Sequence, residues 1–222
     1  MLTKRTMQLG GYDTAAHHWT LVEWSLPEPD PVTNMQDVPG RIKGPLNLSN
    51  VLTDGLPTYG SRPFSATLET SEGDRLAREA RISDIVNHLH GQQKEIVLPD
   101  HPNHYAVGVF TVSRDYNDLA HGAVKISGTC EPWLYARAET VVTLQAAEVA
   151  QTAELINLGV MPVVPVLQVT GGSVIIATST ASFGMEPGTY KWPELYLTPG
   201  EHVVTYQGTG TLTITYREAV LR

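Results

Sequence analysis

The chain has 222 residues, of which 41% are apolar and 17% charged, so it can bury the core of one large or two small globular domains. Its 15 basic and 23 acidic residues give a net charge of −8, which argues against nonspecific binding to nucleic-acid phosphates. The single cysteine, Cys130, cannot form an internal disulfide, and this excludes the small secreted domains that disulfides stabilise.

Neither the N-terminal segment nor the longest apolar run predicts export or a membrane span. The first residues include Lys4 and Arg5 but continue as MQLGGYDTAA, which lacks the apolar core of a signal peptide. The apolar run 160–169 is interrupted by Pro162 and Pro165, and it is much shorter than the about 20 residues that a transmembrane helix needs. We therefore expect a protein without a membrane segment, in a reducing compartment.

The first predicted strand is His18–Leu26. Val22, Trp24 and Leu26 occupy alternate positions in it, so we expect them to share one face and to point into the core. A proline follows directly and recurs at every second position as far as residue 31, which fixes φ and ends the strand.

The segment Leu26–Arg62 is rich in turn-forming residues and has neither helical nor strand periodicity. Val38–Arg41 and Asp54–Gly55 have the composition of tight turns, and NLSN at 47–50 is short and polar. A segment of this length without periodicity counts against a compact domain unless it is a functional loop or contacts another molecule. We interpret it as an arm that grips a neighbouring subunit.

One amphipathic helix is expected, with Asp74 as its N-cap and its last turn near Leu89, before Gly91. Packed on one face of an antiparallel sheet, this helix gives a mainly β, α+β fold for an N-terminal domain of residues 1–142, a β-sandwich or tube-like domain with an extended arm. The apolar residues expected to form the buried helix face are Leu76, Ala80, Ile82, Ile85, Val86 and Leu89.

Two further strands are predicted in this domain. Tyr105–Val112 is apolar on both faces, as expected of a central strand. Gly122–Cys130 alternates between apolar and polar residues, so Val124, Ile126 and Cys130 are expected to point inward and to cover one side of a core.

The second domain is expected to be a small β-sandwich of residues 143–222. Thr143–Thr152 is rich in Ala, Gln and Glu, which predicts a linker or a short helix at its start. Short strands separated by glycine- and proline-containing turns are typical of a sandwich, and in the clearest strand Leu212, Ile214 and Tyr216 share one side. The predicted strands are Val163–Val169, Ser173–Thr178, Glu194–Leu197, His202–Gln207 and Thr211–Arg217.

Four histidines, His88, His90, His101 and His104, do not have the spacing of a metal site. A structural zinc site usually has four ligands in two close pairs, commonly with thiolates, which a chain with one cysteine cannot supply. We expect these histidines on the surface, and neither a bound metal nor a cofactor.

No sequence pattern predicts catalysis. The chain has no Gly-x-Ser-x-Gly elbow, and Cys130 occupies a strand position as a small apolar residue would. Glu28 and Asp30 lie in an open proline run, where nothing distinguishes one carboxylate as acid and the other as base. Gly208–Gly210 lacks the lysine and the following helix of a phosphate-binding loop. We therefore expect that the protein is not an enzyme. The alternative of a small hydrolase is supported only by the histidines.

The aromatic residues of the second domain leave one alternative open. Stacked aromatic rings on a sandwich can hold sugar rings, although aromatic residues at alternating strand positions more often belong to the core. The alternative is a carbohydrate-binding adhesion protein that contacts glycans through Tyr190 and Trp192. The aromatic residues concerned are Tyr190, Trp192, Tyr196, Tyr206 and Tyr216.

Several motifs follow one another along the chain. LPEPDPVTNMQDVPGR begins at Leu26, LNLSNVLTDG begins at Leu46, and YGSRPF contains Tyr59 and Arg62. LHG at the helix end, CEPWLY and TPGEHVVTYQGTGTLTITYRE continue the pattern. Together these motifs resemble the distal tail proteins of long-tailed (siphovirus-type) bacteriophages over most of the chain. One departure is Trp133, where tyrosine is commoner in that family.

This resemblance implies a homohexameric ring, formed by the N-terminal domain, that continues the tail tube, and a galectin-like second domain that holds receptor-binding or fibre components. The tube protein and the tail-tip hub would be further partners, and genome DNA would cross the lumen without specific binding. The protein would be assembled in the host cytoplasm and act at the tail tip of the virion. The motif residues expected to shape the arm and the subunit interface are Pro27, Pro29, Asn34, Asp37, Pro39, Gly40, Arg41, Tyr59 and Arg62.

Overall fold

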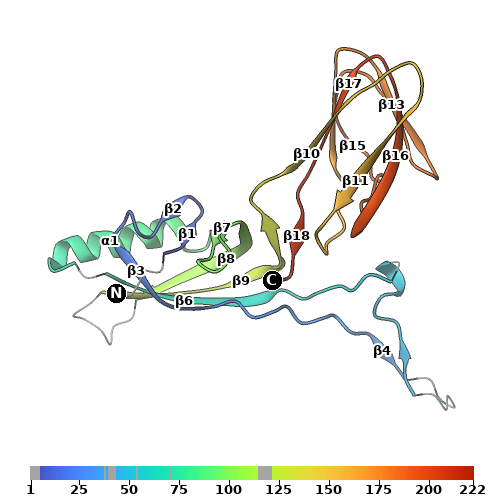
Figure 1. Ribbon diagram of the computed structural model, residues 1–222. Coiled ribbons are helices and arrows are strands. Elements are labelled where there is room, and N and C mark those ends of the chain that lie inside the picture. Colours follow the sequence, from blue (N-terminus) through green and yellow to red (C-terminus); the bar gives the residue numbers. More distant parts are fainter. Residues whose placement is uncertain (1–5, 38, 40–43, 54, 71, 115–121) are drawn as a thin grey trace. The chain divides into compact units, whose positions relative to one another are not determined.

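The computed structural model describes residues 6–37, 39, 44–53, 55–70, 72–114 and 122–222. Strands dominate these residues, with a single α-helix, and the chain divides into two compact units (Figure 1). The first unit contains Met1–Pro132 with Leu221–Arg222, and the second contains Trp133–Val220. The expectation of a mainly β fold is confirmed. No helix among the described residues is long and apolar enough to cross a membrane.

The first unit is built on a sheet with the strand order β2-β1-β7-β8-β9-β6-β3, and β18 (Ala219–Val220) pairs with the end of β9. Helix α1 lies along one face of this sheet (Figure 1). The strands are β1 (Gln8–Leu9), β2 (Tyr12–Asp13), β3 (Trp19–Ser25), β6 (Arg62–Thr70), β7 (Gln93–Val97), β8 (His104–Arg114) and β9 (Ala123–Ala136).

Helix α1 spans Arg75–Leu89 and begins where the capping pattern predicts. The Asp74 carboxylate accepts a 2.9 Å hydrogen bond from the backbone N–H of Ala77, one of the first-turn N–H groups that have no partner within the helix. After the helix, Gly91 adopts a φ of 72°, a left-handed conformation that glycine adopts at little cost.

The buried face of α1 is shorter than its apolar pattern. Ile82, Ile85 and Leu89 are buried against the sheet, but Leu76 is 79% exposed and Ala80 is also exposed. The prediction of one buried face from Leu76 onward is therefore wrong for the first turns. Helical spacing defines which residues share a face, but a neighbouring element must cover that face to bury it.

The predicted core face of the first strand is wrong because β3 contains a bulge. Trp19 and Leu21 are the buried residues, whereas Val22 is 49% exposed. The pairing of β3 with β6 shifts between Leu21 and Glu23, so one extra residue interrupts the alternation. Trp24, beyond the bulge, is half-buried.

The prediction for β9 is confirmed and that for β8 is partly wrong. Val124, Ile126 and Cys130 of β9 are all buried. In β8, Phe110 is buried but its neighbour Val109 is 51% exposed, so only one face of this strand is covered. β8 does lie between β7 and β9 in the sheet, but α1 packs on a single face (Figure 1).

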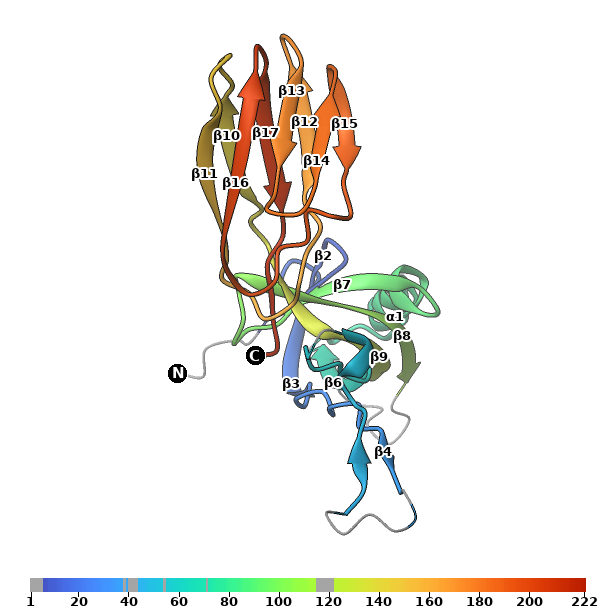
Figure 2. The same ribbon diagram turned by 90° about the vertical axis from the view of Figure 1, so that its right-hand side faces the viewer.

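The second unit is a sandwich of two four-stranded antiparallel sheets, β10-β17-β12-β15 and β11-β16-β13-β14 (Figure 2). Leu212, Ile214 and Tyr216 of β17 are buried between the sheets, as their alternation predicts. The strands are β10 (Thr140–Gln145), β11 (Gln151–Asn157), β12 (Val166–Thr170), β13 (Val174–Ala177), β14 (Ser182–Met185), β15 (Gly188–Lys191), β16 (Gly200–Gly208) and β17 (Thr211–Tyr216).

Thr143–Thr152 does not form the predicted linker or helix. Its first residues complete β10, which pairs with β17 along its whole length, and its last residues begin β11. Pairing with neighbouring strands therefore determines the structure of these residues, although their composition is typical of helices and linkers. The two compact units divide within β9, and the domain limits 1–142 and 143–222 stay a prediction.

Four of the five strands predicted in this unit correspond to β12, β13, β16 and β17. The fifth, Glu194–Leu197, is wrong, because its only strand-like contact is an isolated bridge between Leu197 and Val163. β14 and β15 escape prediction because each has only four residues and contains a glycine.

Candidate subunit interface

The segment between β3 and β6 forms an arm of two antiparallel stretches. At its base, the backbone N–H of Gly60 donates to the carbonyl of Asp30 (2.9 Å), and the N–H of Val32 donates to the carbonyl of Thr58 (2.8 Å). A short 3-10 turn, η1 (Val51–Thr53), lies in the returning stretch. The arm therefore continues the antiparallel pairing of β3 with β6 rather than forming an irregular loop.

The outer part of the arm is a short hairpin, in which β4 (Met35–Gln36) pairs with β5 (Leu46–Asn47). The backbone N–H of Asn34 donates to the hydroxyl of Ser49 (2.8 Å), and the carbonyl of Asn34 accepts from the N–H of Leu48 (2.8 Å). Asn34 is thus held by its backbone, and its side chain lies exposed on the arm.

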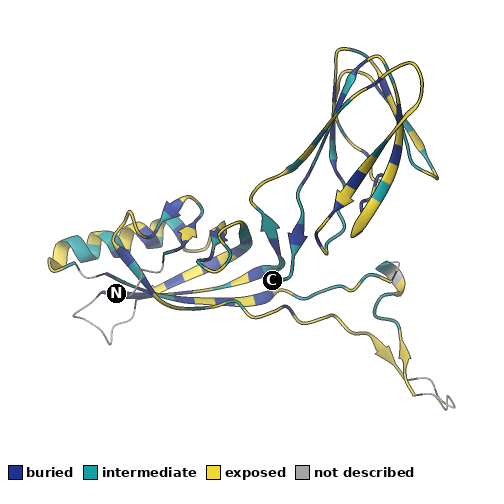
Figure 3. Ribbon diagram, in the orientation of Figure 1, coloured by how far each residue is buried: buried dark blue, intermediate teal, exposed yellow. Residues whose placement is uncertain are grey.

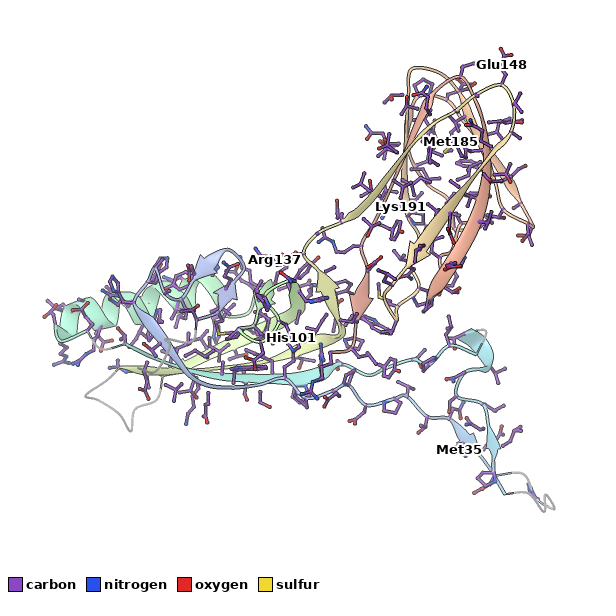
Figure 4. The ribbon with its side chains drawn as sticks, viewed as in Figure 1. Met35, His101, Arg137, Glu148, Met185 and Lys191 are labelled. Carbon is purple, nitrogen blue, oxygen red and sulfur yellow. The ribbon has the colours of Figure 1, made fainter. Side chains whose placement is uncertain are left out.

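The arm exposes large apolar side chains. A two-stranded hairpin has no second layer that could bury them. Figure 3 shows the arm as mostly exposed and half-buried, and Figure 4 marks Met35 on the outer hairpin. Such a surface is suited to being covered by another protein. The exposed apolar residues are Val32, Met35, Leu46 and Val51.

The sequence motif residues lie along this arm and at its base. Pro29 is buried, and Tyr59 forms an isolated bridge with Pro31 across the two stretches. Gly40 and Arg41 lie outside the described residues, so their predicted role stays a prediction. The remaining motif residues of the arm are exposed: Pro27, Asn34, Asp37 and Pro39.

Arg62, the last of the motif residues, is a buried guanidinium at the base of the arm. It is 2% exposed and lies opposite Cys130 in the pairing of β6 with β9. Its Nη1 donates a 3.0 Å hydrogen bond to the carbonyl of Leu221. Its Nε and Nη2 atoms are buried and have no acceptor among the residues that the structure describes.

The charge of Arg62 is only partly compensated. Burial lowers the pKa of its guanidinium, and the neighbouring Cys130 and Glu28 oppose that shift. Burial also raises the pKa of the Cys130 thiol to about 12, so the thiol is uncharged at neutral pH and Glu28 is left as the compensating anion. Glu28 itself pairs with Arg222 at 2.8 Å between Oε1 and Nη1, with both side chains exposed.

Sequence reasoning identified Arg62 but missed the residues around it. Leu221 is 159 positions away along the chain, and no local pattern marks it or Arg222 as a neighbour of the arm. The only sequence signal for the surroundings of Arg62 was Glu28, which lies in the proline run at the start of the arm.

The histidines have structural contacts. Nε2 of His88 lies 2.7 Å from the carbonyl of Leu9, and Nδ1 of His90 accepts from the N–H of Val112 at 3.2 Å. Burial, followed by the nearby His101, lowers the pKa of His104. Among the described residues, no group of three or more His, Cys, Asp or Glu side chains is arranged to hold a metal ion.

The aromatic residues proposed for glycan contact pack within the sandwich. Trp192 is buried and stacks on Phe183, with ring centroids 5.6 Å apart and planes at 22°. Tyr190 meets Phe183 edge-on and donates its hydroxyl proton to the carbonyl of Glu186 (3.0 Å). Tyr196, by contrast, is exposed. Tyr190 and Trp192 therefore form one packed aromatic cluster rather than an open platform for a sugar ring.

No protein-family model matches the chain, and no curated protein matches it by sequence. A solved structure does match, that of SPP1 Dit (gp 19.1), described as a paradigm of the hub adsorption apparatus in phages that infect Gram-positive bacteria, with a TM-score of 0.67. The chain shares the fold of this protein. The match covers 97% of this chain and 99% of Dit at 13% sequence identity, so the likeness is one of fold.

Proposed function

We propose that this chain is a structural protein of a phage tail, a distal ring or hub that connects the tail tube to the tail tip and its receptor-binding components. The observation that carries the proposal is the match in fold with SPP1 Dit over nearly the whole length of both chains. The motifs of the arm favour the same conclusion. In this role the protein has no catalytic residue and needs no cofactor.

The N-terminal domain, residues 1–142, forms the ring in this proposal. A closed ring of identical subunits requires that one patch of each subunit docks onto a different patch of the next. The arm supplies the first patch, because its apolar side chains are exposed and its backbone is held by hydrogen bonds. The sheet and the base of the arm are candidates for the second. A homohexamer is the expected assembly.

The second domain, residues 143–222, holds the receptor-binding or fibre components in this proposal, as a galectin-like sandwich. The ring joins the last ring of the tube protein to the tail-tip hub in the virion. A net charge of −8 is compatible with a lumen that DNA crosses without binding to the wall.

The experiment that tests the ring is light scattering during gel filtration, followed by negative-stain imaging of the peak. We expect a mass about six times the 24.2 kDa of one chain and ring-shaped particles. A chain that remains monomeric up to high concentration, without rings, contradicts self-assembly.

The alternative, a carbohydrate-binding adhesion protein, predicts binding on a glycan array that Tyr190→Ala or Trp192→Ala removes. Burial of Trp192 does not favour it. Stable rings without glycan binding would exclude it.

A further inference from the structure

Arg62 has two donor nitrogens that the described residues of its own chain leave without an acceptor. Nε and Nη2 are buried without an acceptor among the described residues, whereas Nη1 donates to Leu221. Native proteins pair most buried polar groups, because an unpaired one forfeits its hydrogen bonds to water. An arginine with two such donors therefore indicates an acceptor that comes from outside this chain.

The two unused donors have the geometry of a carboxylate site. In a guanidinium the N–H of Nε and one N–H of Nη2 lie parallel on the same edge, and this fork matches the two oxygens of a carboxylate. Nearby Cys130 is an uncharged thiol at neutral pH, and Glu28 is engaged by Arg222. A carboxylate from a partner would supply both the missing acceptors and the missing negative charge.

The segment that accepts the hydrogen bond from Nη1 of Arg62, Leu221–Arg222, is weakly held. Besides the hydrogen bond from Arg62 to Leu221, it is fixed by the ion pair between Arg222 and Glu28, whose side chains are 80% and 64% exposed. Exposed ion pairs contribute little to stability. In the proposed contact, displacement of the Leu221 carbonyl gives an incoming group access to Arg62 and frees Nη1, while Glu28 keeps its pair with Arg222.

The exposed carboxylates of the arm are the candidate partners. Glu28 is already paired with Arg222. Asp30 lies at the arm's base, where its backbone carbonyl accepts from the N–H of Gly60, and not on the outer hairpin. Asp37, directly after β4, is exposed and has no hydrogen bond or ion pair to a described residue. The paired stretches of the arm separate Asp37 from the base of its own arm, where Arg62 lies, so a contact between them requires two chains.

We propose that Arg62 binds a carboxylate from the arm of a second copy of this chain, and that this carboxylate is the side chain of Asp37. This inference rests on the proposed ring and names one of its head-to-tail contacts. Exposed Met35 and Leu46, next to Asp37, bury apolar surface when the arm docks. The ion pair then forms inside the contact, where loss of one partner leaves the other charge unpaired.

The test compares the association of wild-type chain with that of R62M and D37N, by light scattering over a range of concentrations. Each variant is expected to weaken association about 30-fold or more, as is usual for one partner of a buried charge pair. D30N is the matched control, because it removes an arm carboxylate near the base, and it is expected to assemble as the wild type does. R62K keeps the charge without the parallel fork and is expected to weaken association less than R62M.

Mixing R62M with D37N distinguishes a contact between chains from one within a chain. The intact Asp37 of one variant can dock on the intact Arg62 of the other, but the next contact lacks both partners. At a concentration at which each variant alone is monomeric, the mixture is therefore expected to give dimers. No association in the mixture overturns the proposal.

The isolated R62M subunit gives a second readout. Replacement of a buried guanidinium with unpaired donors by an apolar side chain is expected to leave the unfolding temperature unchanged or to raise it. A lower unfolding temperature together with normal assembly contradicts the inference and leaves the ring proposal intact. A wild-type chain that never assembles contradicts both.

Discussion

The indole Nε1 of Trp19 donates a 3.1 Å hydrogen bond to the hydroxyl of Tyr12. Both residues are buried, and the bond joins the start of β3 to the β2 strand at the edge of the sheet. The ring of Tyr12 also stacks on His17, with centroids 3.8 Å apart. This pair fixes the N-terminal hairpin on the sheet.

Tyr12→Phe is expected to destabilise the first unit by about 1–3 kcal/mol, because it leaves the buried indole N–H of Trp19 without an acceptor. Urea unfolding followed by tryptophan fluorescence measures the change. Tyr196→Phe is the control, since it also removes a tyrosine hydroxyl, but from an exposed residue of the second unit, and it should change stability little. Equal effects of the two substitutions would show that the Tyr12 bond contributes nothing.

The same tyrosine predicts a dependence of stability on alkaline pH. Burial, as the main cause, raises the pKa of Tyr12 from 10.0 to about 12. The unfolded chain therefore loses this proton first, so the contribution of Tyr12 is fully present below pH 10 and declines as the pH rises from 10 to 12. The slope is at most about 1.4 kcal/mol per pH unit. Unfolding free energies of wild type and Tyr12→Phe, measured from pH 8 to 11.5, should converge above pH 10.

The bulge in β3 makes opposite predictions for neighbouring residues. Leu21→Ala is expected to cost about 2–5 kcal/mol, because Leu21 is 3% exposed and its removal leaves a cavity. Val22→Ala is the matched control and is expected to change stability by less than about 0.5 kcal/mol, since Val22 is half exposed. If urea unfolding shows a larger loss of stability for Val22→Ala than for Leu21→Ala, β3 has the regular alternation that the sequence predicts and the bulge is absent.

Local signals in the sequence predicted their elements well. Asp74 and Gly91 bound the helix, because capping depends on residues within a few positions of each other. β17 was predicted because its alternation is uninterrupted. β3 was misread, since a bulge is defined by the partner strand, which the sequence of β3 does not contain.

The candidate interface was predicted only in part for the same reason. The turn-forming residues of the arm mark a segment that leaves the core, and this identified the arm itself. The environment of Arg62 depends on Leu221, which is distant in sequence and carries no motif. Whether an arginine is exposed or buried without acceptors follows from tertiary packing alone.

Asn157, at the end of β11, is a buried polar residue that sequence patterns did not reveal. Its Nδ2 donates to the carbonyls of Met161 (2.9 Å) and Leu197 (3.0 Å), and its Oδ1 accepts from the N–H of Gly159 (2.9 Å). Asn157→Ala removes the side-chain partners of the Met161 carbonyl and the Gly159 N–H, while the Leu197 carbonyl still accepts from the N–H of Val163. The substitution is expected to destabilise the second unit by about 2–4 kcal/mol. Thermal unfolding of this variant should be compared with Asn87→Ala, an exposed asparagine of α1, which should behave as wild type.

The exposed apolar side chains of the arm predict that assembly and stability respond separately to substitution. Met35→Ser combined with Leu46→Ser should leave the free energy of unfolding of the isolated chain within about 0.5 kcal/mol of wild type, because neither residue is buried. The same double variant should weaken self-association, since each residue loses the apolar surface that docking removes from water. Val203→Ser, at an exposed valine of the second unit, is the control for loss of surface hydrophobicity.

Light scattering of wild type, the arm variant and Val203→Ser over a range of concentrations measures the difference in self-association. If the arm variant assembles as the wild type does, the arm is not the contact between subunits.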